Sequence, residues 1–259
     1  MKHSPSIFLA AFLLMVGMPN LSIGQDIAEL AVNARDNLYE HWDFKKAASY
    51  FDKVIGKKHA PAFAYSDYGW YLMLLDRHDE GMEYIKRAAN MAPKDKQLVA
   101  WYAWAIIWDG DLPKARQWIQ KALKLDPSYG EALHVSSRIE SVMGNHNEAI
   151  KLALQAASSD PTWRGIVPIV YAHAGQKRLA KESAAQIEKN VNGFDAMFLM
   201  EYYDIIGSEE MTMDYLEKTF ELRHPFMPWI EIMPVFLHLH QKPRFKAVVK
   251  KMNLPNSRN

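Results

Sequence analysis

The chain has 259 residues, of which 49% are hydrophobic and 24% charged, proportions typical of globular domains. It carries 31 Lys and Arg against 30 Asp and Glu side chains, so no overall charge steers it toward nucleic acid or an anionic membrane. It contains no cysteine, which excludes a disulfide framework, a thiolate metal site, a cysteine nucleophile and a lipid anchor on cysteine.

The first 24 residues differ from the rest of the chain. Lys2 precedes an apolar run from Ile7 to Met18, and Pro19 ends that run. The small residues of Ser22-Ile23-Gly24 stand at the spacing that a signal peptidase reads, so residues 1–24 are predicted to be a secretory signal peptide cleaved after Gly24. The alternative is a membrane anchor, but a spanning helix needs about 20 apolar residues. We expect a periplasmic or secreted chain without stable membrane insertion after cleavage.

A spacing of 34 residues dominates the next part of the chain. Pro93, Pro127 and Pro161 are 34 residues apart, and each ends a similar stretch. Small residues keep the same register at Ala47, Gly81, Ala115 and Ala149, and steps of 31 and 32 continue it to Ala180 and Thr212. A small residue lets two helices approach closely, and proline cannot continue a helix interior, so each period predicts one helical hairpin.

Each period also has a distinctive first helix. In residues 62–95 its packed face carries Tyr65, Tyr68, Gly69 and Leu72. Gly69 costs about 1 kcal/mol in a helix interior, so it predicts close approach of the partner helix. An aromatic and glycine-containing first helix, an alanine-rich second helix and a terminal proline resemble the tetratricopeptide repeat. The resemblance implies an all-α fold, a right-handed superhelical α-solenoid of about six helix-turn-helix repeats with a C-terminal capping helix.

The repeat array is expected over residues 25–225, in units 28–61, 62–95, 96–129, 130–163, about 164–192 and about 193–225. Pro168 falls in the first helix of the fifth unit, so that helix should kink or start late. Residues 226–259 are similar to the closing segment of bacterial tetratricopeptide proteins. There the apolar residues Phe245, Val248, Val249 and Met252 share one helical face, which predicts a cap over the last repeat.

The sequence shows few signs of catalytic or metal chemistry. It has no phosphate-binding glycine loop, nucleophile elbow or His-Glu-x-x-His zinc helix. His224, His238 and His240 are possible metal ligands, but alternate residues do not share a helical face, so we interpret them as polar side chains of a capping segment without a metal. We therefore predict no enzyme activity, no catalytic residues, no metal site and no cofactor.

The candidate site lies on the face of the first helices that does not pack within the hairpin. In the family that the chain resembles, this face lines the concave side of the solenoid. An aromatic cluster on such a face indicates a contact surface, and Trp and Arg dominate binding hot spots. The predicted partner-binding residues are Tyr39, Phe63, Trp70, Met73, Trp104, Trp108, His134 and Arg138.

These residues predict an exported protein–protein interaction scaffold that binds a peptide segment or protein partner, and no nucleic acid, in its concave groove. Trp70, Trp104 and Trp108 would be the anchors, and Arg138 and Tyr39 would orient the ligand. An alternative is an envelope glycan or small-ligand binding protein, because indole rings stack on sugar faces. The aromatic residues could instead be buried by superhelical packing, by the C-terminal segment folding back, or in a dimer interface. Neither the partner nor the oligomeric state follows from the sequence.

Overall fold

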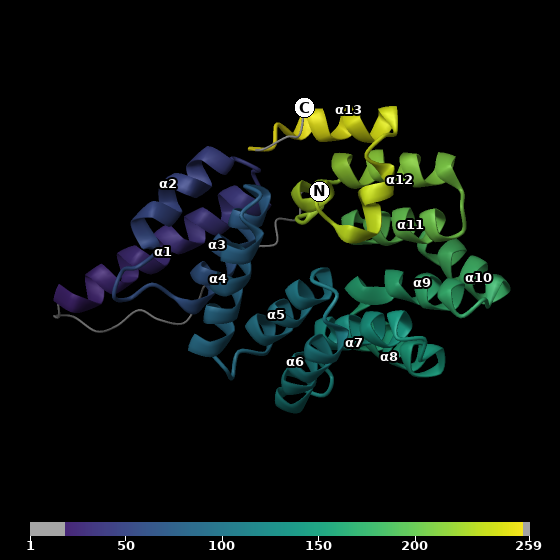
Figure 1. Cartoon of the computed structure of the whole chain (residues 1–259), viewed down its shortest axis with the longest axis horizontal. Coiled ribbons are helices and arrows are strands. Elements are labelled where there is room, and N and C mark those ends of the chain that lie inside the picture. Colours follow the sequence, from purple (N-terminus) through teal and green to yellow (C-terminus); the bar gives the residue numbers. More distant parts are fainter. Residues whose placement is uncertain (1–18, 256–259) are drawn as a thin grey trace.

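A computed structural model describes residues 19–255, with side chains from Asp26 onward. Throughout this part of the chain the regular elements are helices, and they follow one another as antiparallel pairs (Figure 1). The predicted all-α solenoid of about six hairpins with a capping helix is confirmed. Residues 1–18, which carry most of the predicted signal peptide, lie outside the described residues. None of the helices that are described is long and apolar enough to cross a lipid bilayer.

The six hairpins pair each odd-numbered helix with the next even-numbered one. Their bounds are α1 Pro19–Tyr39, α2 Phe44–Val54, α3 Ala62–Leu74, α4 His78–Met91, α5 Lys96–Trp108, α6 Leu112–Leu125, α7 Gly130–Val142, α8 His146–Ser159, α9 Ile166–His173, α10 Lys177–Ile187, α11 Gly193–Ile205 and α12 Glu209–Glu221. Side chains at the second-helix small positions, such as Ala47, Ala115 and Ala149, are fully buried.

In the second hairpin the two backbones touch through a pair of glycines. A Cβ added to Gly69 in α3 would lie 2.6 Å from the carbonyl oxygen of Gly81 in α4, and a Cβ on Gly81 would lie 2.6 Å from that of Gly69. The close approach that Gly69 predicted is therefore confirmed. The small residue of the 34-residue register therefore lies where the two helix backbones touch.

The fifth hairpin has a shortened first helix. A 3-10 helix, η1 Pro161–Gly165, precedes α9, which has 8 residues where α7 has 13. Pro168 is the third residue of α9, in the first turn, where a backbone N–H has no partner within the helix. The late start predicted for this helix is confirmed, because the proline occupies a position that does not require its missing donor.

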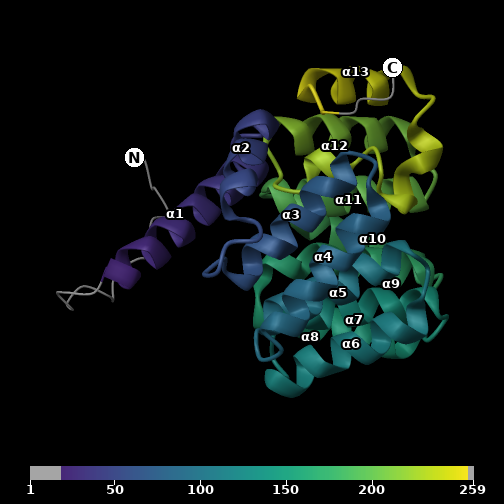
Figure 2. The same ribbon diagram turned by 60° about the vertical axis from the view of Figure 1, so that its left-hand side comes forward.

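The array curls until its last hairpin contacts its first (Figures 1 and 2). The rings of Phe220 in α12 and Trp42 after α1 lie 5.8 Å apart between centroids. Arg223 stacks 4.1 Å over the Trp42 ring and donates a hydrogen bond of 3.0 Å to the carbonyl oxygen of Glu40. These contacts close the concave side around a central space.

The C-terminal segment partly fills that space. After α12 the chain forms two 3-10 helices, η2 Met227–Trp229 and η3 Pro234–Leu239, and then the capping helix α13 Pro243–Met252. Trp229 is fully buried, and its Nε1 donates a hydrogen bond of 2.9 Å to the carbonyl oxygen of Trp70, 159 residues earlier. The predicted capping face of α13 is buried, as expected for a helix that covers the last repeat.

Candidate functional site

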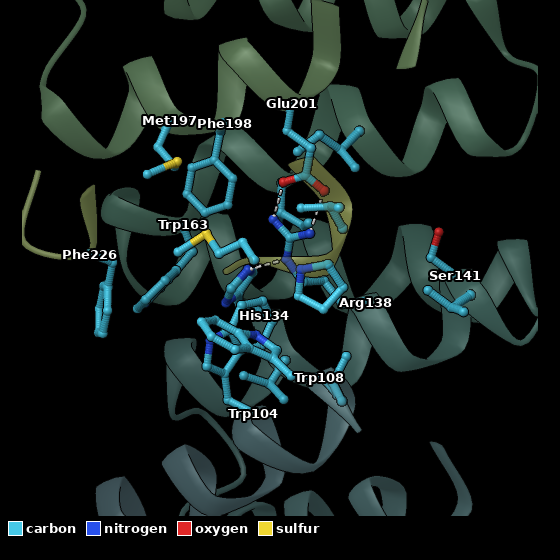
Figure 3. A pocket seen from close by; sticks show the side chains of 18 of the residues that line it. Trp104, Trp108, His134, Arg138, Ser141, Trp163, Met197, Phe198, Glu201 and Phe226 are labelled. Carbon is cyan, nitrogen blue, oxygen red and sulfur yellow. Dashed lines mark hydrogen bonds and ion pairs between the residues drawn. The ribbon is translucent and has the colours of Figure 1, made fainter. Parts of the chain in front are cut away.

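A cavity of about 440 Å³ lies on the concave side, between the first helices of the repeats and the returning C-terminal segment. Helices α3, α5, α7, α9 and α11 contribute to its wall, together with η1 and residues 224–236. Its size falls within the range of roughly 300–1,000 Å³ that is usual for ligand pockets. Figure 3 shows the side chains of this wall converging from α5 at the bottom of the view and α11 at the top.

Indole rings form much of the cavity wall. The five tryptophans that line it are Trp70, Trp101, Trp104, Trp108 and Trp163. Trp70 and Trp108 meet edge to face, with ring centroids 5.2 Å apart. Phe226, from the C-terminal segment, lies 6.1 Å from Trp101 between ring centroids. Such a wall offers large apolar surfaces and ring faces that carry partial negative charge.

A buried ion pair crosses the middle of the cavity wall (Figure 3). Arg138 in α7 donates from Nη1 and Nη2 to the two carboxylate oxygens of Glu201 in α11, at 2.5 and 2.6 Å. The two side chains are 14% and 8% exposed. The guanidinium also lies 5.4 Å over the ring of Trp104. The pair ties the fourth repeat to the sixth and neutralises both charges.

His134 extends this polar cluster. Its Nε2 accepts a hydrogen bond of 2.9 Å from Nε of Arg138, so its own proton resides on Nδ1. Burial, together with the charge of Arg138, lowers the pKa of His134 well below its ordinary value and keeps the ring neutral. The ring stacks on Trp163 at 4.6 Å between centroids. Nδ1 is buried and has no hydrogen-bond partner among the described residues.

A second carboxylate lies at the other end of α7. Glu131 accepts a hydrogen bond of 2.6 Å from Nε1 of Trp101 and another from the hydroxyl of Tyr129. Burial raises the pKa of Glu131 to about 7, and the two hydrogen bonds offset part of this effect. Among the described residues no Lys, Arg or His side chain forms an ion pair with it.

The cavity reaches solvent near the C-terminal end of α7. Val142 and Val235, which line it there, are 63% and 49% exposed. Trp104 and Trp108 are part-exposed, whereas Trp70 is 1% exposed at the back of the wall. An apolar ligand can therefore meet apolar side chains from the mouth inward.

The structure brings some of the predicted site residues together and separates the others. The cavity is lined by Trp104, Trp108, His134 and Arg138. Trp70 also lines it, although the rings of Phe226 and Trp229 pack against the Trp70 ring. The remaining three, Tyr39, Phe63 and Met73, lie outside the lining. Their partner-binding roles stay predictions.

These three side chains are held by contacts within the chain. Tyr39 stacks on Trp229 at 5.4 Å between ring centroids and donates a hydrogen bond to Asp67. Phe63 lies under the guanidinium of Arg35, and Met73 is 1% exposed. The fold-back of the C-terminal segment explains the covering of Tyr39, because Phe226 and Trp229 fill the concave side in front of the first two repeats.

Sequence reasoning missed the contribution of the sixth repeat. Phe194, Met197 and Glu201 line the cavity from α11. They stand 63 positions after Glu131, His134 and Arg138, and 63 is the sum of the 31- and 32-residue steps that lead from Ala149 to Thr212. Adding these steps to the positions of residues on the unpacked face of α7 therefore points to the same three residues. Phe226 lies beyond the repeat array, where no spacing points to it.

His224 and His238, two of the possible metal ligands in the closing segment, have hydrogen-bond partners within the chain. His238 contacts Asp204 through Nε2 at 2.9 Å, and His224 is buried beside Phe194. Among the residues that the structure describes, no three His, Asp or Glu side chains come together as metal ligands do.

Comparison with known proteins agrees with the helical hairpins. The sequence model of the tetratricopeptide repeat matches residues 64–95, the hairpin of α3 and α4. The match shows a tetratricopeptide repeat in this hairpin, and the array of hairpins has the fold of solved proteins built from that repeat. Repeats of this family form scaffolds for protein–protein interaction and are generally not enzymes. No curated protein matches the sequence significantly.

Solved structures share the fold at low sequence identity. PilW, described as a widely conserved type IV pilus biogenesis factor, superposes with a TM-score of 0.57 at 13% identity, over 84% of this chain and 98% of PilW. PilF of Pseudomonas aeruginosa gives 0.55 at 9% identity, over 77% and 93% of the two chains. A tetratricopeptide repeat protein of Parabacteroides merdae gives 0.52 at 16%, over 90% and 95%. At these identities the likeness concerns the fold alone.

Proposed function

We propose that this tetratricopeptide repeat protein is an exported interaction scaffold that holds a segment of a protein partner in its concave cavity. The observation that carries the proposal is a pair of part-exposed indoles, Trp104 and Trp108, in a cavity whose mouth has the exposed Val142. Apolar side chains that reach solvent in a concave surface are typical of a contact site.

The dimensions of the cavity suit a short extended segment. Its lining follows α7 from Glu131 to Val142, and both of these end residues reach solvent. The helical rise places them about 16 Å apart, which an extended segment of about five residues spans. In this proposal Trp104 and Trp108 are the anchors, and His134 and Arg138 orient the segment. Tyr39, Phe63 and Met73 pack within the chain, and the proposal does not depend on their predicted partner-binding roles.

The predicted signal peptide supports export, and we propose a periplasmic or secreted location on that ground. The likeness to PilW does not extend the proposal to pilus assembly, because 13% identity supports only the fold.

A glycan or small ligand is the second candidate occupant of the cavity. It is favoured by the enclosure of one side by Phe226 and Phe236, since small-ligand sites bury most of the ligand surface. Titration of the intrinsic tryptophan fluorescence with envelope glycan fragments and with peptides separates the two candidates. A fluorescence response to glycans alone would favour a glycan over a protein segment as the occupant of the cavity.

Replacement of Trp104 by Ala tests the proposed function. We expect a loss of about 2 kcal/mol or more in affinity for the partner, because buried tryptophans dominate interface energies. The partner is first identified by proximity labelling from the exported chain, and its affinity is then measured by isothermal titration calorimetry.

Trp118→Ala is the matched control, because Trp118 is also part-exposed but lies on α6, outside the cavity lining. It should leave the affinity unchanged. The proposal fails if Trp104→Ala and Trp108→Ala both fold normally and bind the partner as the unmodified chain does.

A further inference from the structure

The cavity wall carries one carboxylate whose charge nothing in the wall balances. Arg138 and Glu201 neutralise each other. Burial lowers the pKa of His173, and it lowers that of His224 to about 3, so both rings are neutral, as is His134. Glu131 remains, with hydrogen bonds from Trp101 and Tyr129 but no ion pair within the described chain. When it is ionised, the wall is negatively charged.

The surroundings of Glu131 are aromatic. Trp101 donates to its carboxylate, and Trp163 lies against the preceding residue, since a Cβ on Gly130 would be 2.8 Å from the indole Cδ1. Phe226, from the C-terminal segment, contacts Trp101 and lines this end of the cavity. Faces of Trp and Phe attract cations electrostatically, and the attraction strengthens where water is excluded. A carboxylate among such rings is the chemistry that recognises an organic cation.

We propose that the end of the cavity at Glu131 receives a cationic side chain, lysine or arginine, from the partner segment. This inference rests on the proposed function and adds the chemistry of the segment to it. Glu131 serves as the counter-ion, and the indoles of Trp101 and Trp163 contact the aliphatic stem and the charged group. Long cationic side chains suit such a site because their stems are apolar while their ends are charged.

Other charged groups near Glu131 do not compete for this role. Lys96 in α5 pairs with Asp126 at 2.5 Å and lies over the ring of Tyr129. Asp160, at the end of α8, raises the pKa of Glu131 further, and proximity to Glu131 adds to the burial that raises the pKa of Tyr129. No cation among the described residues is therefore paired with Glu131, and in this proposal the partner segment supplies one.

The ionisation of Glu131 gives the site a pH dependence. A cation binds the ionised carboxylate, and with a pKa of about 7 that form grows from about a tenth of the molecules at pH 6 to about nine tenths at pH 8. The affinity for a cationic segment should therefore rise about tenfold between pH 6 and pH 8. The affinity for a neutral segment should stay the same.

Four acetylated and amidated pentapeptides test the inference on the full chain. They differ only in the central residue, which is lysine, arginine, norleucine or glutamate, and choline serves as a free cation. Binding is followed by tryptophan fluorescence at pH 6 and pH 8. We expect the lysine or arginine peptide to bind at least about tenfold more tightly than the norleucine peptide at pH 8.

Glu131→Gln should abolish this preference, because glutamine keeps the acceptor for Trp101 but loses the charge. Glu29→Gln, on the exposed side of α1, is the matched control and should retain the preference. If Glu131→Gln does not fold, the pH dependence of peptide affinity in the unmodified chain still tests the inference.

The inference would be overturned if the norleucine peptide bound as tightly as the cationic peptides, or if Glu131→Gln kept the preference for a cation. It would also be overturned if the affinity for the cationic peptides did not change with pH, or if choline bound more tightly than any peptide. So would the absence of peptide binding at millimolar concentration. The proposed function is tested separately by Trp104→Ala. Partner binding that depends on Trp104 but not on Glu131 would support the proposed function and contradict the binding of a cationic side chain at Glu131.

Discussion

Arg138 and Glu201 show how single residues set the properties of the cavity. Both side chains are nearly buried, and each satisfies the other's charge through two hydrogen bonds. Transfer of either charge from water carries a large desolvation penalty, which the partner offsets only while both are present. The pair also holds α7 against α11 across the cavity, so it maintains the shape of the site.

Removal of one partner from this pair should be costly. Glu201→Ala leaves the guanidinium of Arg138 buried without a counter-charge, so we expect the free energy of unfolding to fall by about 3 kcal/mol or more. Replacement of both residues by methionine should cost less, because no buried charge remains. Urea denaturation followed by circular dichroism measures both variants.

The exposed pair of Arg178 and Glu182 on α10 provides the control for that measurement. Their side chains are 76% and 56% exposed, so Glu182→Ala should cost less than about 1 kcal/mol. A loss for Glu201→Ala no larger than for Glu182→Ala would show that the cavity pair is not desolvated in solution.

At the scale of helices, the contact between Gly69 and Gly81 explains why the register is visible in the sequence. The backbone carbonyl of each glycine lies where the Cβ of the other would be, so larger residues would separate α3 from α4. The same seam in other hairpins uses Ala115 or Ala149, which are fully buried. Close packing of the two helices therefore restricts one position in each repeat to a small residue.

Gly69→Ala should destabilise the chain although alanine favours helices. The new methyl group would lie 2.6 Å from the Gly81 oxygen and from Cγ1 of Ile85, and relief of such overpacking typically costs about 1–3 kcal/mol. The gain in helix propensity is only about 1 kcal/mol. Thermal unfolding measures the net effect.

Gly193→Ala serves as the comparison in α11, because a Cβ there would make an ordinary contact of 3.4 Å with the Leu222 oxygen. This variant should unfold within a few degrees of the unmodified chain. If Gly69→Ala were equally stable, the backbone contact between α3 and α4 would not hold in solution.

At the scale of the whole molecule, the curvature of the array and the returning C-terminal segment together create the cavity. Curling brings Phe220 and Arg223 to Trp42, and the segment after α12 then crosses the concave side and buries Trp229 against α3 (Figures 1 and 2). The first two repeats are covered by this segment. The third to sixth repeats contribute most of the wall that remains open to a ligand.

The sequence predicts contacts between neighbouring elements better than it predicts contacts between distant parts of the chain. Helical hairpins, the late start of α9 and the buried face of α13 follow from spacing, because each depends on neighbours in the chain. Trp104 and Arg138 also follow, since they occupy the free face of regular repeats. The covering of Trp70 by Trp229 does not follow, because residues 222–242 carry no repeat and their contacts lie up to 190 positions away, as between Trp229 and Tyr39.

Site-specific photo-crosslinking from the cavity mouth tests the central claim, that a partner segment enters the concave cavity, most directly. A photoreactive phenylalanine analogue replaces Val142, which lines the mouth and is 63% exposed, or Leu154, which is 47% exposed on α8 outside the lining. The partner found by proximity labelling is added to each purified variant. We expect an adduct from position 142, its loss in a chain that also carries Trp104→Ala, and no adduct from position 154. Adducts from position 154 alone, or equally from both positions, would contradict binding in the cavity.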